Sequence, residues 1–185
     1  MILNSSRVSH EKDPETCLRA AAALRENGLN LAVLNLGGGY DDFVHLGSKL
    51  NLRDANKWVL GGPAVHPMKE LCQYYQASDA LVQSSLAEGL GLSPLEALSC
   101  GIPVVATAVG GLAAHLQDHV RLTPRQDWEA MRREILWIAE HPDEARKQAL
   151  KAREEYIVPE WNREKAFAEL ESVLRTVSKE YFVYR

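Results

Sequence analysis

Residues 80–98 read Ala80-Leu-Val-Gln-Ser-Ser-Leu-Ala-Glu-Gly-Leu-Gly-Leu-Ser-Pro-Leu-Glu-Ala-Leu98, and this stretch decides the fold. It opens with an apolar run that is typical of a buried strand. A glycine-rich turn follows, and then a helix-like segment with Pro94 in its first turn, where a missing N–H costs nothing. The stretch therefore predicts a strand that passes through a turn directly into a helix.

The turn is a predicted anion site. A helix start leaves backbone N–H groups without partners, and the helix dipole favours negative charge there. Gly89 and Gly91 let the backbone approach a phosphate closely. Glu88 lies at the mouth of the turn, and Glu96 stands about one turn inside the helix, where it can reach the same ligand. Because phosphates and flanking sugar hydroxyls would suit this arrangement, a nucleotide sugar is the expected partner.

The rest of the chain alternates strand and helix signals. Further strands are expected at residues 2–4, 31–36, 58–60, 104–106 and 120–122. Helices are expected at residues 14–26, 41–50, 67–76 and 93–99, with a short one after Gly111. From Trp128 onward the pattern is wholly helical, with one helix beginning at Pro142 and the last at 161–176.

This alternation indicates an α/β fold: a Rossmann-like doubly wound parallel sheet of about six strands, with helices on both faces. A helical C-terminal tail completes it. We expect residues 1–185 to form a single nucleotide-sugar-binding domain.

Composition is that of an ordinary soluble protein, with 46% hydrophobic and 25% charged residues and a formal net charge of −4. Lys and Arg do not concentrate in one stretch, so nucleic acid is not an expected partner. The chain has no apolar run of transmembrane length and no signal-peptide pattern. We therefore expect a cytoplasmic protein, with peripheral membrane contact left open through a portion outside this chain.

The cysteines Cys17, Cys72 and Cys100 lie far apart in the sequence and lack the spacing of metal ligands. They are expected to be small buried hydrophobic residues in a reducing compartment. Neither a metal nor a cofactor is expected.

Four motifs in a fixed order resemble those of a known protein family. Glu88 through Glu96 match the motif of two glutamates separated by seven residues in the retaining glycosyltransferases of family 4, which the chain resembles. Residues 97–106 match the continuation of that motif. Upstream and downstream of it stand the two other matches.

Arg7 and Lys12 stand five residues apart, like the basic pair of this family. Gly110-Gly111 resembles its second glycine turn. The resemblance covers about residues 2–175, nearly the whole chain.

The resemblance implies a GT-B fold, in which two Rossmann-like domains face each other across a cleft. This chain would be the C-terminal, donor-binding half, and the acceptor-binding N-terminal domain would be absent from it. The implied reaction is retaining, metal-independent transfer of a hexosyl group from a nucleotide diphosphate sugar, UDP- or GDP-linked, to an unknown acceptor.

The resemblance also implies roles for four side chains. Arg7 and Lys12 would neutralise the leaving diphosphate in place of a metal ion; taken alone, they are also typical of solvated charges before a helix. Glu96 would accept hydrogen bonds from the ribose hydroxyls, although a first-turn acid is also favoured by the helix dipole. Glu88 would contact hydroxyls of the donor sugar, and the alternative is a nucleophile as in retaining hydrolases.

Backbone groups complete the predicted donor site. Gly89 would allow close approach, and Gly91, Leu92 and Ser93 would offer N–H groups to sugar and phosphate. Gly62 lies where family members lay the nucleobase against the backbone.

Three positions depart from the family pattern. Ser84 stands where the family usually has proline, Asp13 where glycine is common, and Ala114 where an acid is often found. None of them removes a predicted phosphate ligand, but they weaken the prediction of which donor is bound.

Two other functions remain open from the sequence. The missing acceptor half motivates a non-catalytic nucleotide-sugar-binding or regulatory subunit that acts by complex formation. A sugar epimerase on the same fold is a second alternative, but it needs further acid and base residues that the sequence does not identify.

Overall fold

The computed structural model describes residues 1–62 and 68–182, and its centre is a six-stranded parallel sheet in the order β3-β2-β1-β4-β5-β6. The strands are β1 (Ile2–Asn4), β2 (Val33–Asn35), β3 (Val59–Gly61), β4 (Ala80–Gln83), β5 (Val104–Thr107) and β6 (Arg121–Thr123). In register, Leu3 of β1 lies between Leu34 of β2 and Leu81 of β4. The predicted doubly wound α/β fold is confirmed.

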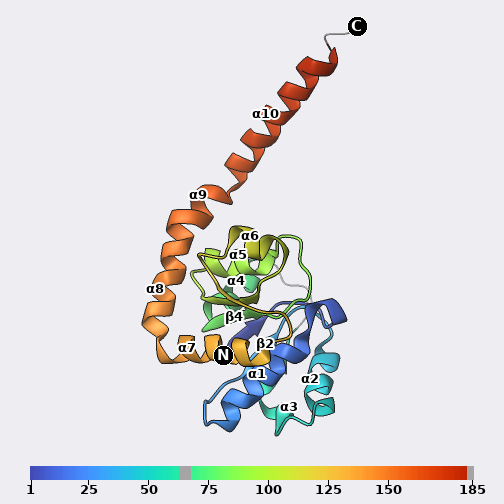
Figure 1. Cartoon of the computed structure of the whole chain (residues 1–185), viewed down its shortest axis with the longest axis vertical. Coiled ribbons are helices and arrows are strands. Elements are labelled where there is room, and N and C mark those ends of the chain that lie inside the picture. Colours follow the sequence, from blue (N-terminus) through green and yellow to red (C-terminus); the bar gives the residue numbers. More distant parts are fainter. Residues whose placement is uncertain (63–67, 183–185) are drawn as a thin grey trace.

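Helices connect the strands and cover both faces of the sheet (Figure 1). They are α1 (Pro14–Glu26), α2 (Tyr40–Lys49), α3 (Ala55–Trp58), α4 (Met68–Gln76), α5 (Leu92–Ser99), α6 (Gly110–His115), α7 (Trp128–Glu140), α8 (Pro142–Ala152), α9 (Val158–Glu160) and α10 (Arg163–Phe182). A short 3-10 helix, η1 (His10–Lys12), precedes α1, and a π-helical turn (Arg153–Ile157) joins α8 to α9.

The sheet separates two hydrophobic cores because successive strand residues point to opposite faces. Ile2 and Val82 pack with α1, α2, α3 and α7. Leu3 and Leu81 pack with α4, α5, α6 and α8 on the other face. Continuous apolar strands are typical of parallel sheets that are covered on both sides.

Four predicted strands have other boundaries in the structure. The strand expected at 104–106 extends to Thr107, and the strand expected at 120–122 lies at Arg121–Thr123. The strand expected at 31–36 is limited to Val33–Asn35. The strand expected at 58–60 begins at Val59, because Trp58 ends the unpredicted helix α3. Trp58 is 2% exposed and its Nε1 donates to the carbonyl oxygen of Arg53 at 3.1 Å. A four-residue helix is too short to give a periodic pattern.

The helix predicted at 67–76 corresponds to α4, and Pro67, its predicted first residue, lies outside the described residues. The cysteine prediction holds only for Cys17, which is fully buried. Cys72 and Cys100 are partly exposed, and their Sγ atoms lie 3.5 Å apart. Sequence distance gave no hint of this contact, because α4 and α5 belong to different strand connections.

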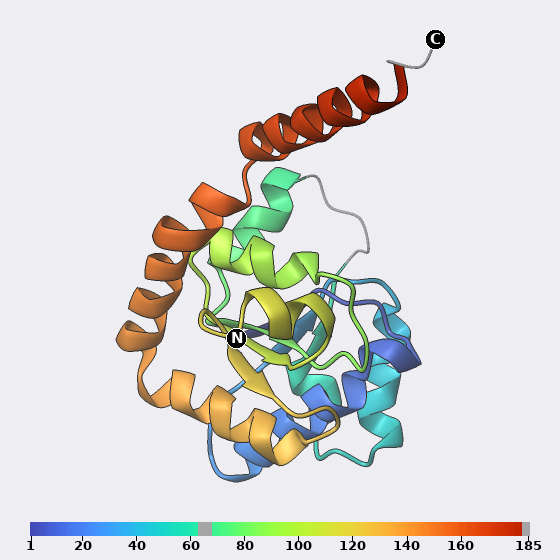
Figure 2. The same ribbon diagram turned by 45° about the horizontal axis from the view of Figure 1, so that its top comes forward.

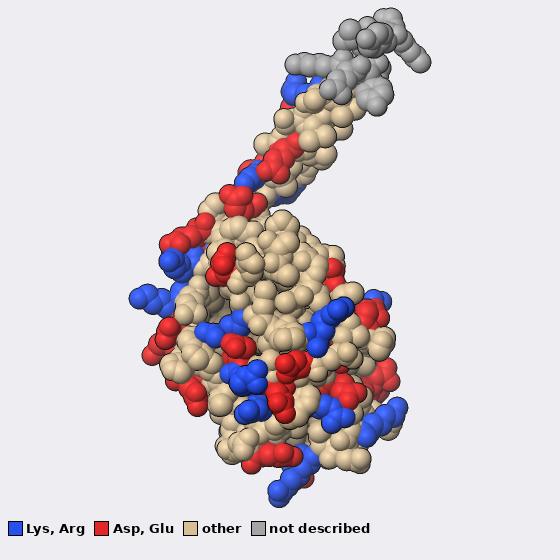
Figure 3. Space-filling view, viewed as in Figure 1, with Lys and Arg blue, Asp and Glu red and all other residues tan. Residues whose placement is uncertain are grey.

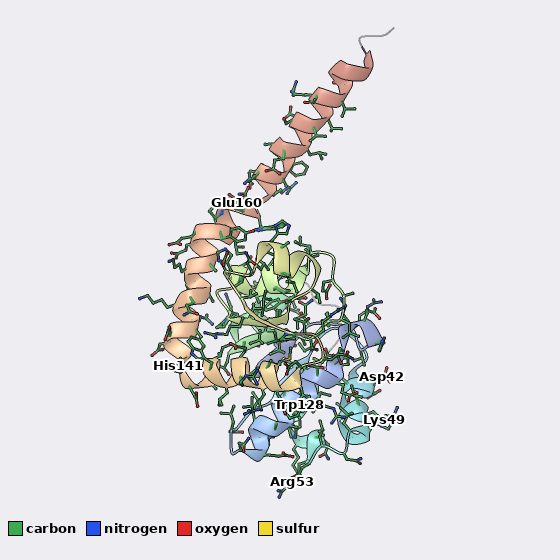
Figure 4. The ribbon with its side chains drawn as sticks, in the orientation of Figure 1. Asp42, Lys49, Arg53, Trp128, His141 and Glu160 are labelled. Carbon is green, nitrogen blue, oxygen red and sulfur yellow. The ribbon has the colours of Figure 1, made fainter. Side chains whose placement is uncertain are left out.

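The helical tail wraps one side of the sheet and then leaves it (Figure 2). Figure 4 marks His141 at the bend between α7 and α8, and Glu160 at the end of α9. Beyond that point α10 projects from the body of the molecule and exposes large apolar side chains, namely Phe167, Leu170, Val173, Leu174 and Val177.

Candidate functional site

Lys12 and Glu88, two of the predicted site residues, lie where the strand order reverses. The chain leaves β1 toward β2 and β3, and then returns to β4 on the other side of β1. Loops after two such strands diverge and leave a crevice at their carboxyl ends, which is where open α/β sheets bind ligands. The loop after β1 carries Lys12, and the loop after β4 carries Glu88.

Glu88 and Lys12 form a direct contact between these two loops. Lys12 Nζ donates to Glu88 Oε1 at 2.6 Å, and the two side chains are only 20% and 10% exposed, respectively. Ser85 Oγ donates to the same oxygen at 2.6 Å, and Gln83 Nε2 also donates to it. Oε1 is thus saturated by three donors. Within the described part of the chain, no residue donates to Oε2, which leaves that oxygen available to a ligand hydroxyl.

The surroundings of Glu88 favour its ionised form. Burial raises the pKa of its carboxyl, but the hydrogen bonds from Lys12 and Ser85, the charge of Lys12 and the hydrogen bond from Gln83 lower it by more. The net pKa lies below the ordinary value, so Glu88 is a carboxylate at neutral pH. An ionised carboxylate accepts hydrogen bonds and cannot serve as a proton donor.

The loop that carries Lys12 is fastened to the loop that carries Glu88. Ser84 Oγ donates to the carbonyl oxygen of Asp13 at 2.6 Å, and the N–H of Leu86 donates to the carbonyl oxygen of Glu11 at 2.8 Å. Asp13 adopts a left-handed conformation (φ 41°) and caps α1 through Thr16, as its place before Pro14 predicts. Two departures from the family pattern, Ser84 and Asp13, therefore contact each other.

Arg7 lies on the same loop but is not brought to Glu88. Its side chain is 73% exposed, and its guanidinium pairs with Glu11 at 2.9 Å. An exposed ion pair of this kind contributes little to stability, so its exchange for a phosphate is energetically easy. The structure separates the two predicted phosphate ligands: Lys12 is largely buried against Glu88, whereas Arg7 is exposed.

Glu96 projects from α5 and is held by a tyrosine that the sequence analysis did not identify. Tyr75, on α4, donates its hydroxyl to Glu96 Oε2 at 2.7 Å. Burial raises the pKa of Tyr75, and the carboxylate of Glu96 raises it further, so the hydroxyl remains a donor. Glu96 therefore has a fixed orientation before any ligand arrives.

The glycines of the site differ in how much space surrounds them. A Cβ on Gly89 would meet no protein atom within 4 Å, so this position is open to a ligand. Gly91 has a φ of 79° and its Cβ would lie 3.0 Å from Leu112. A Cβ on Gly110 would lie 1.9 Å from the carbonyl oxygen of Glu88. Gly110 and Gly91 thus permit close packing of the loops, and only Gly89 leaves free space.

The start of α5 has the predicted form. Gly91 precedes the helix without a side-chain cap, and Leu92 and Ser93 are its first two residues. Leu92 is 66% exposed, which leaves the helix start accessible. Gly62 follows the outermost strand β3 at the same edge of the sheet, and its N–H donates to the carbonyl oxygen of Asn35 at 2.8 Å. The structure places Gly62 two strands away from β1.

The face around Glu88, Gly89, Gly91 and Gly110 is only partly open to solvent. Gly89 and Gly110 are exposed, but Gly91 is buried and the side chain of Glu88 is 10% exposed. Glu88 is enclosed because the buried strand end at Gln83 and the loop with Lys12 close around it.

Three contributors to the site were missed at the sequence level: Tyr75, Gln83 and Ser85. Gln83 carried a usable signal, since it is a polar residue at the carboxyl end of a buried apolar strand. Tyr75 carried none, because its contact with Glu96 depends on how α4 packs against α5. Thr107, at the end of β5, also supports the site by donating to the carbonyl oxygen of Ser85.

Figure 3 shows Lys and Arg interspersed with Asp and Glu over the face in view. Among residues 1–62 and 68–182, no three or more His, Cys, Asp or Glu side chains are grouped so that they could hold a metal ion. In the same described ranges, no helix is long and apolar enough to cross a membrane.

Comparison with known proteins identifies a family and several relatives. Residues 1–155 match the family described as glycosyl transferases group 1. A D-inositol 3-phosphate glycosyltransferase from Actinosynnema mirum is 39% identical over 127 residues, which is 62% of this chain and 29% of that protein. The enzyme of the same name from Saccharomonospora viridis is 34% identical over 154 residues, covering 75% of this chain and 34% of that protein.

Solved structures share the fold over almost the whole chain. Sucrose-phosphate synthase from Thermosynechococcus elongatus superposes with a TM-score of 0.84 at 27% identity, covering 97% of this chain and 45% of that one. Anabaena Alr3699/HepE in complex with UDP gives 0.82 at 19% identity, covering 95% and 48%. This chain spans about a third or less of the length of the curated relatives it matches. The match over residues 1–155 shows that the chain belongs to the glycosyl transferases group 1 family.

Proposed function

We propose that this chain is the donor-binding part of a retaining, metal-independent glycosyltransferase of the family 4 type, with a GT-B architecture. The donor is a nucleotide diphosphate sugar, UDP- or GDP-linked, and a hexosyl group is transferred. The observation that carries this proposal is the carboxylate of Glu88, which has one saturated and one free oxygen and stands just before the α5 start.

Each part of the donor has a partner of suitable chemistry in this proposal. The free Oε2 of Glu88 accepts a hydrogen bond from a sugar hydroxyl. The N–H groups of Leu92 and Ser93 and the ammonium of Lys12 bind the diphosphate. Glu96, oriented by Tyr75, accepts hydrogen bonds from the ribose hydroxyls. Gly89 provides the room for the ligand to approach the backbone.

The reaction breaks the bond between the anomeric carbon and the diphosphate oxygen and forms a bond from that carbon to the acceptor oxygen. The proton of the acceptor hydroxyl passes to the leaving diphosphate, so that atoms and charges balance. Cations and dipoles that face the departing oxygen lower the barrier most, because negative charge grows there in the transition state. Lys12 and the start of α5 supply that stabilisation, and Arg7 joins them when it leaves Glu11 for a phosphate.

In this proposal Glu88 acts as a hydrogen-bond acceptor and not as a nucleophile. Three donors on Oε1 draw negative charge to that oxygen and hold the carboxylate in place. The three bonds fix the orientation of the carboxylate, so that its free Oε2 can accept a hydrogen bond from a sugar hydroxyl. Attack of the acceptor on the face that the diphosphate leaves accounts for retention without a protein nucleophile.

The acceptor is bound by a further domain in this proposal. The chain spans about a third or less of the length of its curated relatives, and a second half would supply the acceptor site and the near-attack geometry. We therefore expect weak nucleotide binding and negligible transfer by the chain alone. Fusion to an acceptor-binding half, or its addition in trans, should restore transfer.

Isothermal titration calorimetry with UDP and a UDP-hexose tests the proposal, with GDP and GDP-hexose as a second pair. We expect the sugar-bearing ligand to bind more tightly than the nucleotide, and Glu88→Gln to remove that difference while nucleotide affinity stays unchanged. Glu155→Gln, an exposed carboxylate on the π-helical turn, is the matched control. If the wild type shows no preference for the sugar-bearing ligand of either pair, the role of Glu88 is wrong.

A further inference from the structure

Two cysteines on neighbouring helices face each other beside the candidate site. Cys72 lies on α4, and Cys100 directly follows the last residue of α5. Their Sγ atoms are 3.5 Å apart, and both residues are partly exposed, so a small oxidant can reach them. The third cysteine, Cys17, is fully buried, and burial raises the pKa of its thiol to about 12.

The pair lies at the two ends of the segment that carries Glu88 and Glu96. A bond between Cys72 and Cys100 would close a covalent loop that contains β4, the turn with Glu88, and all of α5. The same two helices are already joined by the hydrogen bond from Tyr75 to Glu96. Tyr75 lies one turn after Cys72, and Glu96 lies one turn before Cys100. The sulfur pair and the hydrogen bond therefore lie about one helical turn apart between α4 and α5.

We propose that Cys72 and Cys100 form a reversible disulfide that covalently closes the loop bearing the candidate site. The oxidant is a low-molecular-weight disulfide such as oxidised glutathione. A thiolate of the pair attacks one glutathione sulfur and releases a glutathione thiolate; the second cysteine then attacks the mixed disulfide and releases the other. Two thiols lose two electrons and two protons, and one glutathione disulfide becomes two glutathione thiols.

The two sulfur atoms can be joined with little movement. Closing the S–S bond requires the sulfur atoms to approach to about 2.05 Å, a small movement for two side chains at helix surfaces. Burial raises the pKa of Cys100 to about 11, with the neighbouring Cys72 as the next cause, so its thiolate is scarce at neutral pH. Exchange should accordingly be faster at pH 9 than at pH 7, because the thiolate is the attacking species.

The test uses the full chain, reduced and then incubated with oxidised glutathione. We expect a loss of two hydrogen masses in the intact protein, a Cys72–Cys100 cross-linked peptide in a digest, and a Tm raised by about 5–10 °C. Dithiothreitol should reverse all three changes. Cys17 should remain a free thiol throughout.

Single-cysteine variants make the assignment specific. Cys72→Ser and Cys100→Ser should each gain a single glutathione adduct and show no rise in Tm, whereas Cys17→Ala should still form the disulfide. Separate glutathione adducts on both cysteines of the wild type would overturn the proposal, as would a covalent dimer, a disulfide that includes Cys17, or no reaction. None of these readouts depends on nucleotide binding, so the outcome is independent of the proposed function.

Discussion

The ion pair between Lys12 and Glu88 gives a prediction whose size follows from the structure. In Lys12→Met the alkyl chain still packs, but the ammonium that donates to Oε1 at 2.6 Å is removed. A hydrogen bond to a charged group contributes about 1.5–3 kcal/mol, and breaking a fully buried ion pair costs about 3–5 kcal/mol. Glu88 keeps its bonds from Ser85 and Gln83. We therefore expect a loss of about 1–3 kcal/mol in the free energy of unfolding at pH 7.

The loss should depend on pH with a definite sign. Because the folded-state pKa of Glu88 is lowered, its ionised form adds stability above the pKa of the unfolded chain, and this stability disappears as the pH falls through the folded-state pKa. Lys12→Met removes much of that contribution. The difference between wild type and variant should thus be largest near neutral pH and should shrink as the pH falls through the lowered folded-state pKa of Glu88, because the carboxyl is then protonated.

Urea denaturation followed by circular dichroism from pH 3 to pH 8 measures this difference. Lys151→Met is the matched control, because Lys151 forms an exposed pair with Glu155, and it should change stability little at any pH. In a double-mutant cycle, Lys12→Met should cost much less in the Glu88→Gln background. A loss of equal size at every pH, or an unchanged cost in that background, would refute the electrostatic account of the pair.

Three further substitutions separate packing from ligand binding. Gly110→Ala should lower the free energy of unfolding by about 1–3 kcal/mol in urea denaturation, because its Cβ would lie 1.9 Å from the carbonyl oxygen of Glu88; unchanged stability would contradict the close contact. Gly89→Ala should leave stability unchanged but weaken the binding of a nucleotide sugar in calorimetry, and equal affinity would show that no ligand occupies that space. Tyr75→Phe should weaken nucleotide binding by about 1–2 kcal/mol, since Glu96 loses the donor that orients it, and a tighter complex would mean that Tyr75 competes with the ligand.

The sequence was informative where local signals and the fold agree. The run from Ala80 through the turn to Ser99 forms β4, a loop and α5 as predicted, because apolar strand and helix-start signals follow one another directly. Asp13 caps α1 through Thr16 for the same reason. These features depend on neighbours in the chain, and so local sequence patterns could predict them.

What the sequence could not predict depends on contacts between distant segments. Tyr75 reaches Glu96, and Cys72 reaches Cys100, only because α4 packs beside α5. Helix α3 has four residues, and its formation depends on the burial of Trp58. The pairing of Arg7 with Glu11 likewise follows from the shape of the loop after β1, which no periodic pattern encodes.

Titration of the purified chain with UDP, GDP and ADP, in the wild type and in Glu96→Gln, tests the central claim most directly. We expect at least one of these nucleotides to bind, and Glu96→Gln to weaken its binding by about 1–3 kcal/mol through loss of charge-assisted hydrogen bonds to the ribose. Failure of all three nucleotides to bind at millimolar concentration, or equal affinity of the two proteins, would contradict the assignment of this crevice as a nucleotide-sugar site.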